Sequence, residues 1–181
     1  MYDRAPLCIH AIGADGCLVG ITRDRSQREQ AEQDLRRLSR THAVLSRCNR
    51  SLARAVDERA LLDAFCTNLV EVGRYGFAWV GYGGRRDARI RLAAYTEQGD
   101  LGFATSIVAA ANSGEHHSAC RVACERGEPV ILRDLSSRCD LAPWADAALA
   151  QGFRSMIALP LQADHGPFGN FSIFADTPDA F

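Results

Sequence analysis

The stretch EHHSACRVAC, residues 115–124, places two histidines and two cysteines close together. On a helix, His117, Cys120 and Cys124 are three and four residues apart and therefore share one face. Imidazole and thiolate ligands together suit zinc, iron or copper, although a structural zinc site would need a fourth ligand from elsewhere in the chain. A metal- or redox-sensing site is therefore one interpretation of this stretch.

The same stretch also fits the packing face of an amphipathic helix. Ala119, Cys120, Ala123 and Cys124 would form a small apolar face, while Arg121 would face away from it. Buried cysteine behaves as a compact hydrophobic side chain, which lets a helix approach a sheet closely. The pattern favours packing, and metal or redox sensing stays open as the alternative.

The composition is that of an ordinary globular protein. The 181 residues are 47% hydrophobic and 24% charged, enough for one good-sized domain with an appendage. The net charge of -1 gives no electrostatic reason to expect nucleic acid or an anionic membrane as a partner. All 21 basic residues are arginine, and we interpret them as a composition bias because they are scattered among acidic residues along the chain.

The sequence also indicates a cytoplasmic protein. No apolar run approaches the roughly 20 residues that a membrane-spanning helix needs, and no segment resembles a signal peptide. The seven cysteines are odd in number and include no CxxC pair, so we expect reduced thiols rather than a disulfide framework.

The first 55 residues differ in pattern from the rest. Residues 7–23 read as a hairpin around an Asp-Gly turn, and a polar helix without Gly or Pro is expected over 26–55. This helix carries a heptad-like seam, and such a seam predicts a dimer contact. The alternative is a single amphipathic helix packed on its own domain. The predicted interface residues are Ala31, Leu35, Leu38, Leu45 and Leu52.

The remaining sequence predicts one sheet with helices on both faces. A helix is expected over 58–72, with Asp57 as its N-cap and Gly73 as its stop, and another over 142–152. The last two strands are expected to form a hairpin. A doubly wound parallel sheet would need a helix between every two consecutive strands, and this sequence lacks that alternation. The fold class is therefore α/β (α+β), a sandwich with a mainly antiparallel sheet of five or six strands. The strands are expected at 76–82, 90–97, 129–134, 155–162 and 168–175; residues 101–111 form a mostly apolar segment.

The second half of the chain resembles the GAF domain family of bacterial signalling proteins. The resemblance lies in an Ala-Pro-Trp run, a helix that ends in Gly-Phe-Arg-Ser, a strand that ends in Leu-Pro-Leu, and a closing Pro-x-x-Phe. These motifs occur in the family's order, and the resemblance covers about residues 40–181. The matching positions are Ala142, Pro143, Trp144, Gly152, Phe153, Arg154, Ser155, Leu159, Pro160, Leu161, Gly169, Pro178 and Phe181.

The N-terminal residues resemble the last strand and exit helix of a PAS domain. The matching positions are Gly20, Asp24, Arg28, Ala31 and Glu32. The resemblance implies three parts: a C-terminal PAS remnant at 1–25, a signalling or coiled-coil linker helix at 26–55, and a GAF domain at 40–181. The chain would then be a fragment of a longer PAS–GAF protein.

The GAF resemblance implies a non-catalytic sensory module that binds a small molecule, mediates dimerisation, or does both. Its expected partners are an unidentified small-molecule ligand, a second copy and a downstream output domain on the same chain: a diguanylate cyclase (GGDEF), a cyclic di-GMP phosphodiesterase, or a histidine kinase of a two-component system. No cofactor is implied. One GAF-like family reduces free methionine sulfoxide, but its His-x-x-Cys-Asp run is missing here, because the corresponding segment LAQGFRS has neither residue. Enzymatic activity is therefore the less favoured reading.

Strand alternation suggests where a ligand pocket would lie. In GNFSIFA, Asn170, Ser172 and Phe174 face one side of the strand, and Phe171 and Ile173 face the other. An amide and a hydroxyl beside aromatic side chains are typical of a small-molecule site. The alternative for the tryptophans is ordinary core packing. The candidate ligand-binding residues are Trp79, Tyr95, His116, His117, Cys120, Trp144, Met156, Asn170 and Ser172.

Overall fold

The computed structural model divides the chain into two compact units, residues 1–42 and 43–181. The structure describes residues 10–12, 18–20, 25–83, 89–96, 101–113, 118–137 and 144–181.

Residues 1–42 contain a strand pair and most of a long helix. Strands β1 (His10–Ile12) and β2 (Leu18–Gly20) pair antiparallel, as the predicted hairpin requires; its Asp-Gly turn lies outside the described residues. Helix α1 (Arg25–Leu52) follows, close to its predicted bounds, and continues into the second unit. In the part of the chain that the structure describes, no helix is both long and apolar enough to cross a membrane.

Residues 43–181 are built on one antiparallel sheet, with the strand order β4-β3-β7-β6-β5. Its longest strand, β7, lies at the centre and pairs with both β3 and β6, and the predicted β6–β7 hairpin is confirmed. The antiparallel α/β class is confirmed, with five strands in this sheet. They are β3 (Phe77–Tyr82), β4 (Arg91–Tyr95), β5 (Val130–Leu132), β6 (Ser155–Ala163) and β7 (Gly166–Ala175).

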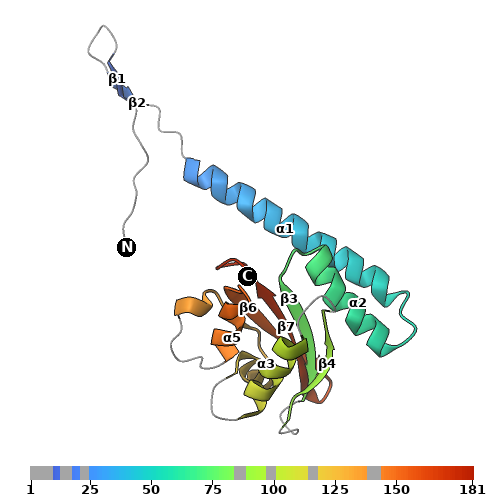
Figure 1. Ribbon diagram of the computed structural model, residues 1–181. Helices are drawn as coiled ribbons and strands as arrows, with labels where there is room; N and C mark the ends of the chain where they lie inside the picture. Colours follow the sequence, from blue (N-terminus) through green and yellow to red (C-terminus); the bar gives the residue numbers. More distant parts are fainter. Residues whose placement is uncertain are drawn as a thin grey trace. The chain divides into compact units, whose positions relative to one another are not determined.

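Helices cover both faces of the sheet (Figure 1). Helix α2 packs on β3 and β4 from one side, while α3 packs on β4, and α4 on β6 and β7, from the other. The carboxylate of Asp57 accepts a hydrogen bond from the Ala60 amide at 2.8 Å, so the predicted N-cap of α2 is confirmed. The helices are α2 (Glu58–Glu71), α3 (Leu101–Ser113), α4 (Ala119–Arg126) and α5 (Trp144–Ala150), with a 3-10 turn η1 at Leu135–Ser137.

The sequence analysis assigned no element to residues 101–111, where the structure has α3. Nearly every residue of this segment is small or apolar, so it shows no polar stripe from which a helical period could be read. Helix α5, Trp144–Ala150, lies within the helix that was expected over 142–152, whose first two residues are outside the described part of the chain.

The sheet separates two hydrophobic cores. The core under α3, α4 and α5 contains four phenylalanines whose ring centroids lie 5.1–6.3 Å apart in several pairs: Phe77, Phe103, Phe153 and Phe174. The core under α2 contains strand residues that alternate in sequence with those of the first core, among them Val80 and Ile173. Strands β3, β4, β6 and β7 therefore each supply both cores, whereas β5 contributes Val130 and Leu132 to the first core alone.

We expect Phe174→Ala to lower the free energy of unfolding by about 3–5 kcal/mol, because it leaves a large cavity among buried aromatic rings. Phe168→Ala, in the same strand, is the matched control and should cost less than about 1 kcal/mol, because Phe168 is 46% exposed. Urea unfolding followed by circular dichroism measures both. Equal losses would contradict the described placement of β7.

Candidate functional site

Strands β3 and β7 bring two polar side chains into an otherwise apolar core. Trp79 lies opposite Ser172 and Gly81 lies opposite Asn170, so these positions share the sheet face that α4 covers. Asn170 and Ser172 are completely buried. An amide and a hydroxyl therefore lie under α4, on the face that the alternation in GNFSIFA predicted.

A short chain of hydrogen bonds joins this polar pair to α4. The amide Nδ2 of Asn170 donates to Ser172 Oγ at 2.9 Å, and Ser172 Oγ lies 3.3 Å from Cys120 Sγ. One turn further along α4, the Cys124 thiol donates to the carbonyl oxygen of Gly169 at 3.2 Å. Both cysteines thus attach α4 to β7.

Three buried polar atoms on this side of the sheet have no hydrogen-bond partner among the described residues: Asn170 Oδ1, Trp79 Nε1 and Trp144 Nε1. The two indoles belong to the same core cluster, with Trp79 fully buried and Trp144 4% exposed. A buried polar group without a partner costs about 1–3 kcal/mol, so native proteins rarely keep several in one core without a reason. Two donors and one acceptor of this core are therefore left without a partner among the described residues.

Gly81 permits a close approach of its neighbours, because no side chain fits at this position. A Cβ at this position would lie 2.6 Å from Trp79 Cζ3, 2.7 Å from Ile90 Cγ2 and 3.1 Å from Asn170 Oδ1. The pairing of β3 with β4 also shifts register between Val80 and Gly81, and such irregularities often lie next to functional sites. The indole, the amide oxygen and a strand irregularity thus meet at one point.

Asn112 fixes the nearby start of β4. Its Oδ1 accepts a hydrogen bond from the Ile90 amide at 2.7 Å, and its Nδ2 donates to the Ile90 carbonyl at 2.8 Å. The Asn112 side chain therefore links helix α3 to the edge of the site. Its carbonyl and its amino group both have hydrogen-bond partners, whereas the side-chain carbonyl of Asn170 has none among the described residues.

The buried thiols near this site are poor nucleophiles. Burial raises the pKa of Cys120, although hydrogen bonds from Ser172 and Ser118 act in the opposite direction. Burial raises the pKa of Cys124 to about 11, with a further increase from the neighbouring Cys120. Since the thiolate is the reactive form, these cysteines carry little nucleophilic character at neutral pH.

Most of the predicted ligand-binding residues lie in one place. Trp79, Cys120, Trp144 and Met156 belong to one buried core cluster, and Tyr95 packs against it opposite Trp79 in β4. Asn170 and Ser172 lie on the same sheet face. The two remaining candidates, His116 and His117, lie outside the described residues.

Gly81, Ile90 and Asn112 also lie at this site but were not among the predicted residues. A glycine inside the strand-forming run FAWVGY is a signal for a bulge or a close approach, and it could have marked Gly81. The pairing of Asn112 with Ile90 joins residues 22 positions apart, and no local pattern reveals it.

The alternative metal site rests partly on His117, outside the described residues. Within the described part of the chain, no group of three or more His, Cys, Asp or Glu side chains is placed to hold a metal ion. Cys120 and Cys124 face β7 from the buried side of α4, as the packing interpretation of this stretch predicts.

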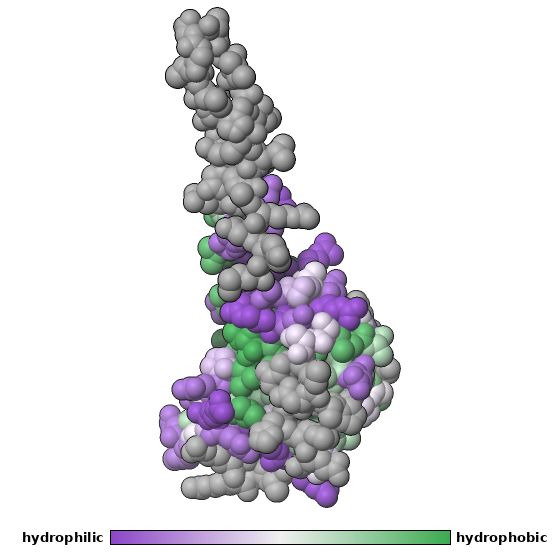
Figure 2. All heavy atoms as spheres, turned by 90° about the vertical axis from the view of Figure 1, so that its left-hand side faces the viewer, coloured by the Kyte–Doolittle hydropathy of each residue, from purple (hydrophilic) through white to green (hydrophobic). Residues whose placement is uncertain are grey.

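The predicted dimer-interface residues are exposed in the single chain. Leu35, Leu38, Leu45 and Leu52 are 56–67% exposed, and Ala31 is also exposed. Among the residues that Figure 2 colours, both hydrophilic and apolar side chains reach the surface, the apolar ones in patches. Exposed leucines on a charged helix leave apolar area available for association.

The fold is an α/β sandwich in which an antiparallel sheet carries a buried polar pair under short helices. The chain belongs to the GAF domain family, because the family model described as GAF domain matches residues 55–181. GAF domains are commonly sensory or regulatory parts of signalling proteins. A comparison with curated proteins found no match.

Several solved structures share the fold. Free methionine-R-sulfoxide reductase from Neisseria meningitidis, in complex with its substrate, is 18% identical, with 81% of this chain and 78% of that chain covered and a TM-score of 0.58. The Aquifex aeolicus NlH2 GAF domain in an inactive state is 16% identical, with 78% and 82% covered and a TM-score of 0.57. A GAF sensor protein from Burkholderia vietnamiensis is 14% identical, with 78% and 83% covered and a TM-score of 0.56. At these identities the similarity shows the fold alone.

We expect Cys66 and Cys124 to resist alkylation in the folded protein. Burial raises the pKa of Cys66 from 9.0 to about 12, so its rate with iodoacetamide at pH 8 should be at least about a hundredfold lower than in urea. Peptide mapping by mass spectrometry should find the half-buried Cys48 modified first among these three. Rapid labelling of Cys124 at pH 8 would contradict its described burial.

The folded-state pKa values of Cys66 and Cys124 lie above the ordinary value. Their contribution to the free energy of unfolding should therefore be fully present below about pH 9 and fall as the pH rises towards 11–12.

Proposed function

We propose that this chain is a non-catalytic sensory GAF domain that binds a small polar molecule under α3, α4 and α5 and controls an output domain in a longer bacterial signalling protein. The observation that carries this proposal is the set of three unpartnered buried polar atoms on Trp79, Trp144 and Asn170. A ligand that presents acceptors to the two indoles and a donor to the amide oxygen would remove their desolvation cost. The ligand class is therefore a compact molecule with mixed hydrogen-bonding groups and an apolar part.

The state of the cysteines supports a binding role over catalysis. Cys120 and Cys124 are used for packing and for hydrogen bonds to β7, and their raised pKa values disfavour the thiolate that a sulfoxide reductase needs. The similarity to the Neisseria meningitidis reductase is one of fold. Turnover of free methionine sulfoxide with a thiol reductant would contradict this part of the proposal.

Signal transfer would use the exposed face of α1. A ligand bound under α3, α4 and α5 can shift a dimer from one arrangement to another only if the two arrangements bind that ligand with different affinities. We propose that α1 forms the dimer contact through its leucine seam, that a PAS domain precedes it, and that the output is a diguanylate cyclase, a cyclic di-GMP phosphodiesterase or a histidine kinase.

Asn170→Leu tests the binding site. It removes the unpartnered carbonyl together with one hydrogen bond, so the free energy of unfolding should change by less than about 1 kcal/mol. Stabilisation by ligands from a library of small polar metabolites, measured as a shift in Tm, should be lost.

Asn112→Leu is the matched control. Both groups of the Asn112 side chain bond to the backbone of Ile90, so this change should cost about 2 kcal/mol or more and keep the ligand-induced shift. The proposal fails if no compound in the library stabilises the wild-type chain, or if both variants keep the shift.

Leu45→Arg tests the dimer. Sedimentation of the wild-type chain should give a dimer, and the variant should sediment as a monomer, because a charge would enter the apolar seam. Leu101→Arg is the control, since Leu101 is 53% exposed in α3 and outside the seam. A wild-type monomer, or a dimer that Leu45→Arg leaves intact, would contradict the seam.

A further inference from the structure

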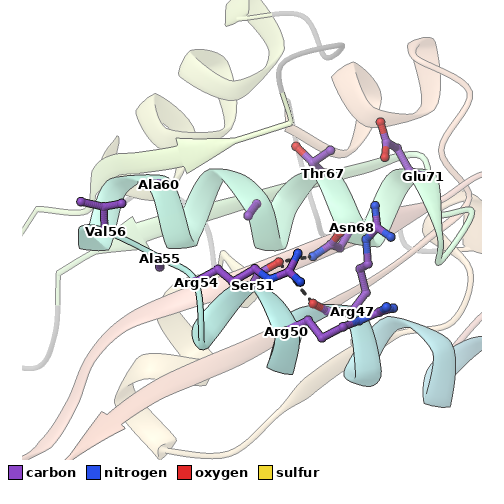
Figure 3. A pocket seen from close by; sticks show the side chains of 11 residues that line it. Arg47, Arg50, Ser51, Arg54, Ala55, Val56, Ala60, Thr67, Asn68 and Glu71 are labelled. Atoms are coloured by element: carbon purple, nitrogen blue, oxygen red, sulfur yellow. Dashed lines mark hydrogen bonds between the residues drawn. The ribbon is translucent and has the colours of Figure 1, made fainter.

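A groove lies between the last turns of α1 and helix α2, away from the candidate ligand site (Figure 3). Its volume is about 490 Å³. Three arginines of the α1 side, Arg47, Arg50 and Arg54, line one wall. Ala60, Ala64 and Thr67 of α2 line the other.

The arginine wall belongs to an uninterrupted basic segment. Residues 35–56 contain six arginines and no aspartate or glutamate, although along the whole chain the two signs nearly balance. The interpretation of the arginines as interleaved with acidic residues therefore fails for this segment. Within the described residues, the guanidinium groups of Arg47, Arg50 and Arg54 form no ion pair and no hydrogen bond. Three cations are thus free to meet an external anion.

The spacing of the arginines indicates the shape of that anion. Arg47 and Arg50 are three residues apart in α1, so their Cβ atoms lie about 5–6 Å apart, and Arg54 follows four residues later, just beyond the helix end. Figure 3 shows them spaced along the groove, with Ala60 and Thr67 across from them. A row of cations matches carboxylates repeated along a helix, whereas a compact anion needs cations that converge on one point.

The α2 wall suits a helix as well. Ala60, Ala64 and Thr67 are four and three residues apart, and their small side chains permit a second helix to approach closely. Beneath them, Asn68 Nδ2 donates to Ser51 Oγ at 3.0 Å, so these two polar groups already have a hydrogen-bond partner inside the protein. Val56, which is 94% exposed, adds apolar area at one end of the groove.

We propose that this α1–α2 arginine groove binds an acidic amphipathic helix of a partner protein. Carboxylates at positions i, i+3 and i+7 of the partner pair with the three arginines, and its adjacent small or apolar residues pack on Ala60 and Ala64. Glu71 lines the same end of the groove as Arg47 (Figure 3) and repels a uniformly charged polyanion, which favours a peptide over nucleic acid.

A second copy of the same segment is a poor occupant, because it would place arginine against arginine. The groove also differs from the leucine seam. Leu45 and Arg47 are two residues apart and so lie about 160° apart around α1, whereas Arg54 lies just beyond the end of that helix. Dimerisation through the seam and docking in the groove therefore use different sides of one helix.

The test uses the full chain and a fluorescent, end-capped, alanine-based peptide of about 18 residues, long enough to be helical. The peptide carries glutamates at i, i+3 and i+7 beside a leucine and alanine stripe. A second peptide of identical composition distributes its glutamates around the helix. Fluorescence anisotropy should show binding of the patterned peptide at least about fivefold tighter than that of the scrambled one, and weaker binding as salt increases.

Arg50→Glu/Arg54→Glu should weaken binding of the patterned peptide at least about tenfold. The matched control, Arg36→Glu/Arg37→Glu, reverses two exposed charges of the same helix outside the groove and should change binding less than about twofold. Ala64→Gln, which narrows the groove without changing its charge, should also weaken binding. Circular dichroism confirms that each variant is folded.

Three outcomes would overturn the proposal. The first is the absence of measurable binding to the patterned peptide at low salt. The second is equal weakening by the groove and control double variants, which would show attraction to the whole basic helix. The third is tighter binding of a heparin fragment than of the peptide with the same dependence on Arg50 and Arg54, which would show a general polyanion surface.

Discussion

The alternation of side chains along β7 is the constraint on which the rest of the second unit depends. This strand lies at the centre of the sheet and pairs with β3 and β6 along most of its length. Because its residues alternate between faces, Ile173 enters the core under α2 while Phe174 enters the aromatic core on the opposite side. A shift of one residue would exchange both sets, so burial on two faces fixes the register.

The same strand carries two buried polar side chains in an otherwise apolar core. Asn170 and Ser172 occupy positions where an apolar side chain would pack more simply, and Asn170 leaves its carbonyl oxygen without a partner among the described residues. Buried polar groups of this kind raise the energy of the empty domain, and a ligand that satisfies them recovers that energy on binding. A sensory domain benefits from such a core, because its stability then depends on whether the site is filled.

The sequence predicted those parts of the fold that have local signals. The β6–β7 hairpin, the Asp57 cap and the antiparallel sheet follow from turn residues, capping chemistry and alternation, and all are confirmed. Helix α3 was missed because its residues are nearly uniformly apolar. At the site, alternation placed Asn170 and Ser172 correctly, but the meeting of Gly81, Trp79 and Asn170 depends on pairing between distant strands. The arginine groove was not predicted, because the net charge averages over the whole chain. This average hides the basic segment 35–56, which lies between two acidic segments.

The division of β7 between two cores has an evolutionary consequence. Substitutions at 170 and 172 change the face of β7 that α4 covers, and substitutions at 171 and 173 change the face that shares a core with α2. The cores on the two sides of the sheet can therefore diverge separately through neighbouring codons. A lineage can alter the buried polar pair on one side of this strand while it inherits the packing of α2 unchanged on the other.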